Sequence, residues 1–130
     1  MKLILTRYPL KIILISLMAS LLLLNVGRIL AQSMSIDSPT GSTTENATQY
    51  ELFSMTIDMS GGVTPYEVVA TGLPSGFSAI IDDDGFGATI VGVTSQSGTF
   101  SVTLDANDSN PDAAATDSVT FDIEVVAVAG

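Results

Sequence analysis

Two segments near the end of the chain alternate regularly between apolar and polar residues. In Thr99–Asp105 and in Ser118–Val126 every second residue is apolar, from Phe100 to Leu104 and from Val119 to Val125. A period of two is the period of a β-strand that buries one face, and it is incompatible with a helix. We therefore predict two long strands here, paired as a hairpin across the loop Ala106–Asp117.

The rest of the chain after residue 32 shows the same preference for strands. Runs rich in Val, Ile, Thr, Phe and Tyr recur at intervals of about 8–14 residues, separated by clusters of Gly, Pro, Ser and Asp. This spacing is typical of an all-β sandwich or barrel. Four further strands are predicted at Tyr50–Met59, Tyr66–Ala70, Phe77–Ile81 and Ala88–Val93.

The first 31 residues have the features of an export signal. Three cations lie within residues 1–11, and an apolar stretch follows from Ile12 to Gly27. This hydrophobic leader helix is short for a membrane span and suits a signal peptide cleaved after Ala31. The alternative is an uncleaved membrane anchor. Both predict that the remainder is secreted or on the cell surface, and that only the N-terminal segment contacts a membrane.

Composition excludes several function classes. The chain has no Cys, no His and no Trp, so it lacks a disulfide framework, a thiol nucleophile and an imidazole base. All four cations lie in the first 28 residues, whereas residues 32–130 carry 14 carboxylates and no basic side chain. Such a surface repels a phosphate backbone, so no nucleic acid is expected. We also predict that the protein is not an enzyme.

The predicted organisation has three parts. Residues 1–31 form the leader, and residues 32–48, rich in Ser and Thr, form a linker with room for one edge strand around Ser33–Asp37. Residues 49–130 form a single domain. With the edge strand included, the sandwich has about seven strands.

Four turn motifs resemble a known bacterial family. They are Gly61-Gly62-Val63-Thr64-Pro65-Tyr66, Thr71-Gly72-Leu73-Pro74-Ser75-Gly76-Phe77, Ile90-Val91-Gly92-Val93-Thr94 and Ser97-Gly98-Thr99-Phe100-Ser101-Val102. Their order and spacing over residues 50–126 are similar to the He_PIG type of immunoglobulin-like domain, which is related to cadherin-like modules. The resemblance implies an immunoglobulin-like antiparallel β-sandwich in a surface or secreted protein, as one module among several. Val93-Thr94 departs from the family pattern, and only one module is present.

The acidic residues are unevenly distributed among the predicted loops. If consecutive strands run antiparallel, the loops Ser60–Pro65, Asp82–Gly87 and Ala106–Asp117 share one end of the sandwich. Eight of the 14 carboxylates lie in or beside these loops, and none lies in Thr71–Gly76 or Thr94–Gly98. We therefore predict an acidic loop end.

An acidic loop end suggests calcium, which prefers several oxygen ligands. The segment Asp105–Pro111 is similar to the Asp-x-Asn-Asp-Asn-x-Pro calcium linker of cadherins, with Ser109 in place of an Asn. The candidate Ca²⁺ ligands are Asp82, Asp83, Asp84, Asp105, Asn107, Asp108 and Asp112. The alternatives are that these residues only populate exposed turns, or that the loops bind a protein or a sugar.

Together these features predict an exported, non-catalytic binding or adhesion module, stabilised by Ca²⁺ if the acidic loops hold it. Its partner is a protein or a carbohydrate at the cell surface, and Tyr50, Tyr66 and Phe86 could offer aromatic faces to a sugar. The alternative function is a structural subunit of an extracellular assembly formed by β-strand addition.

Overall fold

The structure, a computed structural model, describes residues 32–129. This part of the chain contains eight strands and no helix, which confirms the all-β prediction, and so it offers no helix that could cross a membrane. The predicted leader helix lies outside the described residues. The strands are β1 (Met34–Ser38), β2 (Thr44–Thr48), β3 (Phe53–Gly61), β4 (Glu67–Thr71), β5 (Phe77–Ile81), β6 (Gly87–Gly92), β7 (Gly98–Asn107) and β8 (Thr116–Val126).

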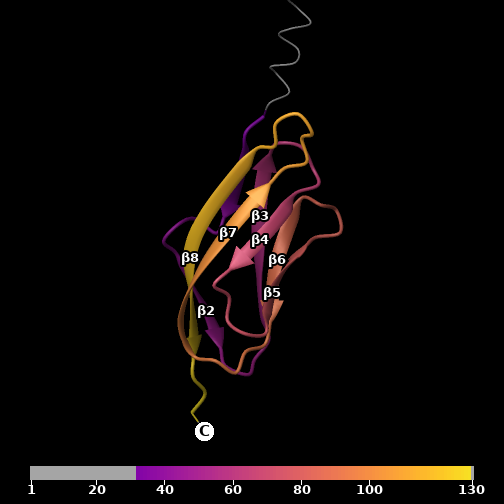
Figure 1. The fold of residues 1–130 in the computed structure, drawn as a ribbon. Coiled ribbons are helices and arrows are strands. Elements are labelled where there is room, and N and C mark those ends of the chain that lie inside the picture. Colours follow the sequence, from indigo (N-terminus) through magenta and orange to yellow (C-terminus); the bar gives the residue numbers. More distant parts are fainter. Residues whose placement is uncertain (1–31, 130) are drawn as a thin grey trace, which may run out of the picture. The chain divides into compact units, whose positions relative to one another are not determined.

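The strands form two four-stranded sheets that face each other (Figure 1). One sheet has the order β1-β3-β6-β5, and the other has the order β2-β8-β7-β4. These orders match the ABED and CFG sheets of an immunoglobulin fold, with β2 as an extra strand beside the last one. The predicted immunoglobulin-like sandwich is therefore confirmed.

The prediction of about seven antiparallel strands needs a correction. The described residues form eight strands, and β2 pairs with β8 in parallel, from Thr44 opposite Asp122 to Thr48 opposite Val126. The cause is a change of sheet early in the chain. β1 pairs with β3 in the first sheet, and the chain then crosses to the second sheet, where β2 runs beside β8 in the same direction.

Residues 32–48, predicted as a linker, are thus part of the sandwich. The edge strand expected around Ser33–Asp37 is present as β1, but β2 was not predicted. Its composition explains the difference, because Ala47 is its one buried apolar residue. A strand that buries one small side chain has too weak an apolar pattern to be distinguished from a polar linker.

The alternating segments at the end of the chain supply much of the core. β7 and β8 pair over ten residues from Gly98 opposite Val125 to Asn107 opposite Thr116, as the predicted hairpin requires. Val102, Leu104, Phe121 and Ile123 are each at most 1% exposed. They pack between the sheets with the inward residues of β3 and β6, such as Ile57 and Ile90.

A glycine in the first sheet makes room for an aromatic pair. Gly92 of β6 lies opposite Phe53 of β3 on one side and opposite Phe77 of β5 on the other. The two rings stack with centroids 5.0 Å apart and planes 3° from parallel. A Cβ atom on Gly92 would collide with the carbonyl oxygen of Gly76. Glycine at position 92, in the motif Ile90-Val91-Gly92, is therefore needed for close packing at this end of the core.

Candidate functional site

Three loops meet at one end of the sandwich. They are the β3–β4 loop (62–66), the β5–β6 loop (82–86) and the β7–β8 loop (108–115), and we call them together the loop pole. The Tyr66 amide donates to the Gly85 carbonyl at 3.2 Å, and the Ser109 amide donates to the Val63 carbonyl at 2.9 Å. These bonds between loops confirm the predicted grouping. Figure 1 places the start of β1 at the same end as the β7–β8 loop.

The opposite end is built from other loops and has few acids. The Tyr50 amide donates to the Thr94 carbonyl at 2.8 Å, and the Ser75 amide donates to the Gln96 side-chain oxygen at 2.6 Å. The β4–β5 and β6–β7 loops carry no carboxylate, as predicted, while Glu51 lies in the β2–β3 loop. Acidic residues therefore concentrate at the loop pole.

Asp108 joins two loops of the pole. It is only 6% exposed, and it accepts three backbone hydrogen bonds. The Val63 amide donates to Oδ2 at 2.9 Å, while the Ala115 and Asn110 amides donate to Oδ1 at 2.7 and 3.3 Å. Burial alone raises the pKa of this carboxyl, but the three backbone hydrogen bonds outweigh it and hold the pKa below its ordinary value. Asp108 thus serves as an ionised link between the β3–β4 and β7–β8 loops.

The acids of the β5–β6 loop shape their own turn. Asp82 Oδ1 accepts a hydrogen bond from the Thr89 hydroxyl at 3.1 Å, and Asp84 Oδ1 accepts one from the Phe86 amide at 3.0 Å. Asp83 is exposed to solvent. Two of the three candidate carboxylates here therefore hold the loop conformation.

The remaining candidate ligands are spread along the hairpin. Asp105 and Asn107 are exposed residues of β7, opposite Ser118 and Thr116. Asp112 is exposed near the tip of the loop. Within residues 32–129 no three acidic side chains are gathered closely enough to hold a metal ion. The loop pole brings the two candidate segments to one end, and calcium binding stays a prediction.

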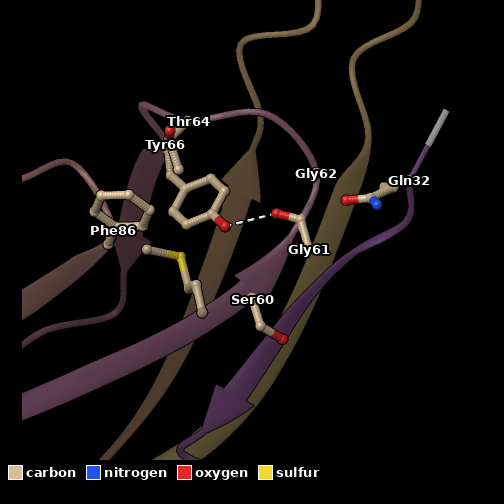
Figure 2. A pocket seen from close by; sticks show the side chains of 8 residues that line it. Gln32, Ser60, Gly61, Gly62, Thr64, Tyr66 and Phe86 are labelled. Carbon is tan, nitrogen blue, oxygen red and sulfur yellow. Dashed lines mark hydrogen bonds between the residues drawn. The ribbon is translucent and has the colours of Figure 1, made fainter. Parts of the chain in front are cut away.

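A shallow hollow of about 400 Å³ opens on this end (Figure 2). The Tyr66 hydroxyl donates to the Gly61 carbonyl at 2.6 Å, and this bond orients the ring, which is 4% exposed. The Phe86 ring lies beside it and is 59% exposed. The hollow is lined by Gln32, Met59, Ser60, Gly61, Gly62, Thr64, Tyr66 and Phe86.

Two positions in the hollow require glycine, because of their backbone conformation and because neighbouring atoms leave no room for a side chain. Gly61 and Gly62 have positive φ angles of 72° and 60°, which residues with a side chain rarely adopt. A Cβ atom on Gly62 would also lie 2.7 Å from Asp108 Oδ2. The sequence motif marked this segment only as a turn. Its role in the hollow depends on Tyr66 of the same segment and on Phe86, which the β5–β6 loop brings beside it.

Comparisons with known proteins place the fold but not a family. No family model and no curated protein matches the chain, so the He_PIG resemblance stays a prediction. Among solved structures, the titin M10 and obscurin-like 1 immunoglobulin complex matches 77% of this chain and all of its own, with a TM-score of 0.50 and 10% identity. The described part is therefore an immunoglobulin-like domain.

Two larger proteins contain a similar domain. An inferred α-galactosidase/melibiase of Bacteroides fragilis matches 72% of this chain, with a TM-score of 0.55 and 24% identity. An endo-fucoidan hydrolase of glycoside hydrolase family 107 matches 76%, with a TM-score of 0.58 and 16% identity. The chain spans only 17% and 14% of the lengths of these two proteins. At these identities the likeness concerns the fold.

Proposed function

We propose that this protein is an exported, non-catalytic binding module that contacts a protein or a carbohydrate with its loop pole. One observation carries the proposal: Phe86 stays 59% exposed beside a hollow in which the Tyr66 backbone is bonded to Gly85 of the β5–β6 loop and the Tyr66 hydroxyl to Gly61. A rigid concave site with an exposed aromatic side chain is the usual form of a recognition surface. Export rests on the leader sequence.

The non-catalytic part of the proposal is supported by composition and by context. The chain offers no imidazole, thiol or, after residue 28, any cationic side chain for acid–base or nucleophilic chemistry. In the α-galactosidase and the fucoidan hydrolase the matching region is a small fraction of the whole protein. In the titin complex the matching chain is itself an immunoglobulin domain. A non-catalytic binding role is consistent with a domain that occurs both as a small region of large hydrolases and as a separate immunoglobulin domain.

A binding panel with matched variants tests this function. Purified residues 32–130 would be applied to an array of polysaccharides and extracellular matrix proteins, as wild type, as Phe86→Ser and as Leu52→Ser. Leu52 is 73% exposed and belongs to the loop between β2 and β3, so it controls for the loss of an exposed apolar side chain. We expect a bound probe that Phe86→Ser loses and Leu52→Ser keeps. No bound probe, or equal loss in both variants, contradicts the proposal.

The leader can be tested separately. The full chain would be expressed in a bacterial host, and the mature protein would be recovered from the medium or the cell envelope. We expect N-terminal sequencing to find Gln32 as the first residue. A protein that stays in the cytoplasm with Met1 in place would contradict export.

Calcium belongs to this proposal as a secondary element. The acids of the β5–β6 and β7–β8 loops lie at the same end of the sandwich, and a divalent ion that binds only the folded state would raise its stability. Thermal melts in CaCl₂ and in MgCl₂ at equal ionic strength provide the test. A higher melting temperature in CaCl₂ supports the site, and identical curves remove the metal from the proposal.

A second candidate function is assembly through an edge strand. β5 is an edge strand of the first sheet, its five residues carry no charge, and Ile80 is 54% exposed. Unpaired, uncharged edges readily accept another strand. β1 and β2 are already paired within the sandwich, so the donor would come from another copy's β5.

Sedimentation measurements decide between assembly and a monomer. If β5 mediates assembly, the wild type sediments as a dimer or larger, and Ile80→Lys converts it to a monomer. Val69→Lys on the edge strand β4 is the matched control, since Val69 is 58% exposed. A wild type that stays monomeric at high concentration excludes this function.

A further inference from the structure

The Phe86 ring is presented on a fixed backbone. The Gly85 amide donates to the Asp82 carbonyl at 2.8 Å, and Gly85 has a positive φ of 73°, so the turn before Phe86 is tight. The Asp84 carboxylate then accepts the Phe86 amide at 3.0 Å. Phe86 therefore presents an exposed apolar ring from a backbone that these hydrogen bonds hold in place.

The rim around the ring is polar and uncharged. Figure 2 shows Phe86 beside Tyr66 and Thr64, with Gln32 on the other side of Gly61 and Gly62; the Ser60 hydroxyl points away from the two rings. Hydroxyl and amide groups beside an aromatic face are the groups that match a sugar ring. Its C–H face packs on the aromatic ring, and its hydroxyls exchange hydrogen bonds with the rim.

The charge of the domain restricts the kind of sugar. Asp83 and Asp84 lie in the same loop as Phe86, and residues 32–130 hold no cation that could pair with an anionic ligand. Sulfate or uronate groups close to these carboxylates would be repelled, most strongly at low ionic strength. A neutral glycan meets no such penalty.

We infer that the hollow binds a neutral polysaccharide, with one sugar ring stacked on Phe86 and hydroxyls of this or the adjoining sugars bonded to Thr64 and Gln32. This inference rests on the proposed binding function and names its ligand class. The stacking on Phe86 supplies the largest share of the affinity, because the rim groups are exposed and exchange bonds with water.

Native gel electrophoresis in polysaccharide-containing gels tests the inference. Gels would contain mannan, a neutral β-glucan, a neutral galactan or, as the anionic comparison, dextran sulfate. We expect retardation of the wild type by at least one neutral polysaccharide and none by dextran sulfate. Phe86→Ala should weaken the apparent affinity about tenfold, the effect of losing an aromatic stacking partner. Leu52→Ala should leave the affinity unchanged.

A second variant keeps the test independent of Phe86. Thr64→Lys places a long charged side chain at the rim of the hollow, and it should also abolish retardation. Circular dichroism melts of each variant control for folding. Retardation only by dextran sulfate, no retardation by any neutral gel, or retardation that survives both hollow variants overturns the inference.

The experiments distinguish failure of the glycan inference from failure of the proposed binding function. If the panel finds a protein whose binding depends on Phe86 while no neutral gel retards the domain, the binding module stands and the glycan inference fails. If no probe depends on the hollow, both fail together.

Discussion

At the scale of single residues, Asp108 is the side chain on which the loop pole depends most. Its carboxylate accepts amides from both the β3–β4 and the β7–β8 loops, and it is almost fully buried. An amide side chain at this position could accept only part of these bonds and would present an N–H group to a donor. A buried donor left without an acceptor destabilises the folded state.

We therefore expect Asp108→Asn to lower the melting temperature, whereas Asp112→Asn leaves it nearly unchanged because Asp112 is exposed. Thermal melts followed by circular dichroism at neutral pH measure both. Equal melting temperatures for the two variants would contradict the linking role of Asp108.

The same carboxylate predicts a pH dependence. Its folded-state pKa lies below the ordinary value of 3.8, so its contribution is complete above that pH. As the pH falls below 3.8 toward the folded pKa, the unfolded chain takes up the proton first and the contribution is lost. The gap in unfolding free energy between wild type and Asp108→Asn should thus be constant near neutral pH and shrink below pH 3.8. A gap that widens on acidification would contradict this assignment.

Part of this arrangement could be predicted from residues alone. Asp108 precedes Ser109 and Asn110, and its short-range bond to the Asn110 amide is the kind of turn that such sequences favour. Its bond to Val63, 45 residues earlier, depends on the fold. Because this long-range bond cannot be seen in the sequence, Asp108 was predicted as a metal ligand. In the structure each of its carboxylate oxygens accepts at least one backbone amide.

At the scale of elements, the packing of β6 between β3 and β5 depends on Gly92. Gly92→Ala would push the new Cβ against the Gly76 carbonyl and disturb the stacked rings above it. We expect a loss of about 1–3 kcal/mol in unfolding free energy, the usual range for overpacking a core. Gly41→Ala is the control, because its Cβ would make only ordinary contacts at 3.9 Å. Denaturant titrations that show equal losses would contradict the packing account.

The edge strand β1 has a tether of its own. Asp117 at the start of β8 accepts the Ile36 amide at 2.7 Å and so bridges the two sheets. Asp117→Ala removes this acceptor, and we expect the Ile36 amide to exchange with deuterium at least about tenfold faster, a change that 1.4 kcal/mol of local stability produces. Amides in the middle of β7 should be less affected. Unchanged exchange at Ile36 would show that the tether does not protect β1.

The strands that bury many apolar side chains were predicted well, and the strand that buries few was not. β7 and β8 each alternate over many residues, and their predicted bounds differ from the observed ones by about two residues or fewer. β2 buries Ala47 alone and pairs in parallel with a strand more than 70 residues away, so neither its pattern nor its neighbours in sequence could indicate it.

At the scale of the whole domain, charge is the dominant feature. Residues 32–130 carry 14 negative side chains and no positive one. Repulsion among them destabilises the compact state, and salt screens it, with a screening length of about 30 Å at 0.01 M and about 10 Å at 0.1 M. We expect the melting temperature to rise when NaCl is increased over this range. A fall would mean that attractive contacts outweigh the repulsion.

Binding at the loop pole can be located by an NMR titration of residues 32–130 with the polysaccharide or protein that binds in the panel. We expect backbone amide shifts to change in the segments 59–66 and 84–87, around the hollow. The amides of the β4–β5 and β6–β7 loops, at the other end of the sandwich, should stay in place. Shift changes confined to that other end, or along β5 alone, would contradict the assignment of the loop pole as the binding surface.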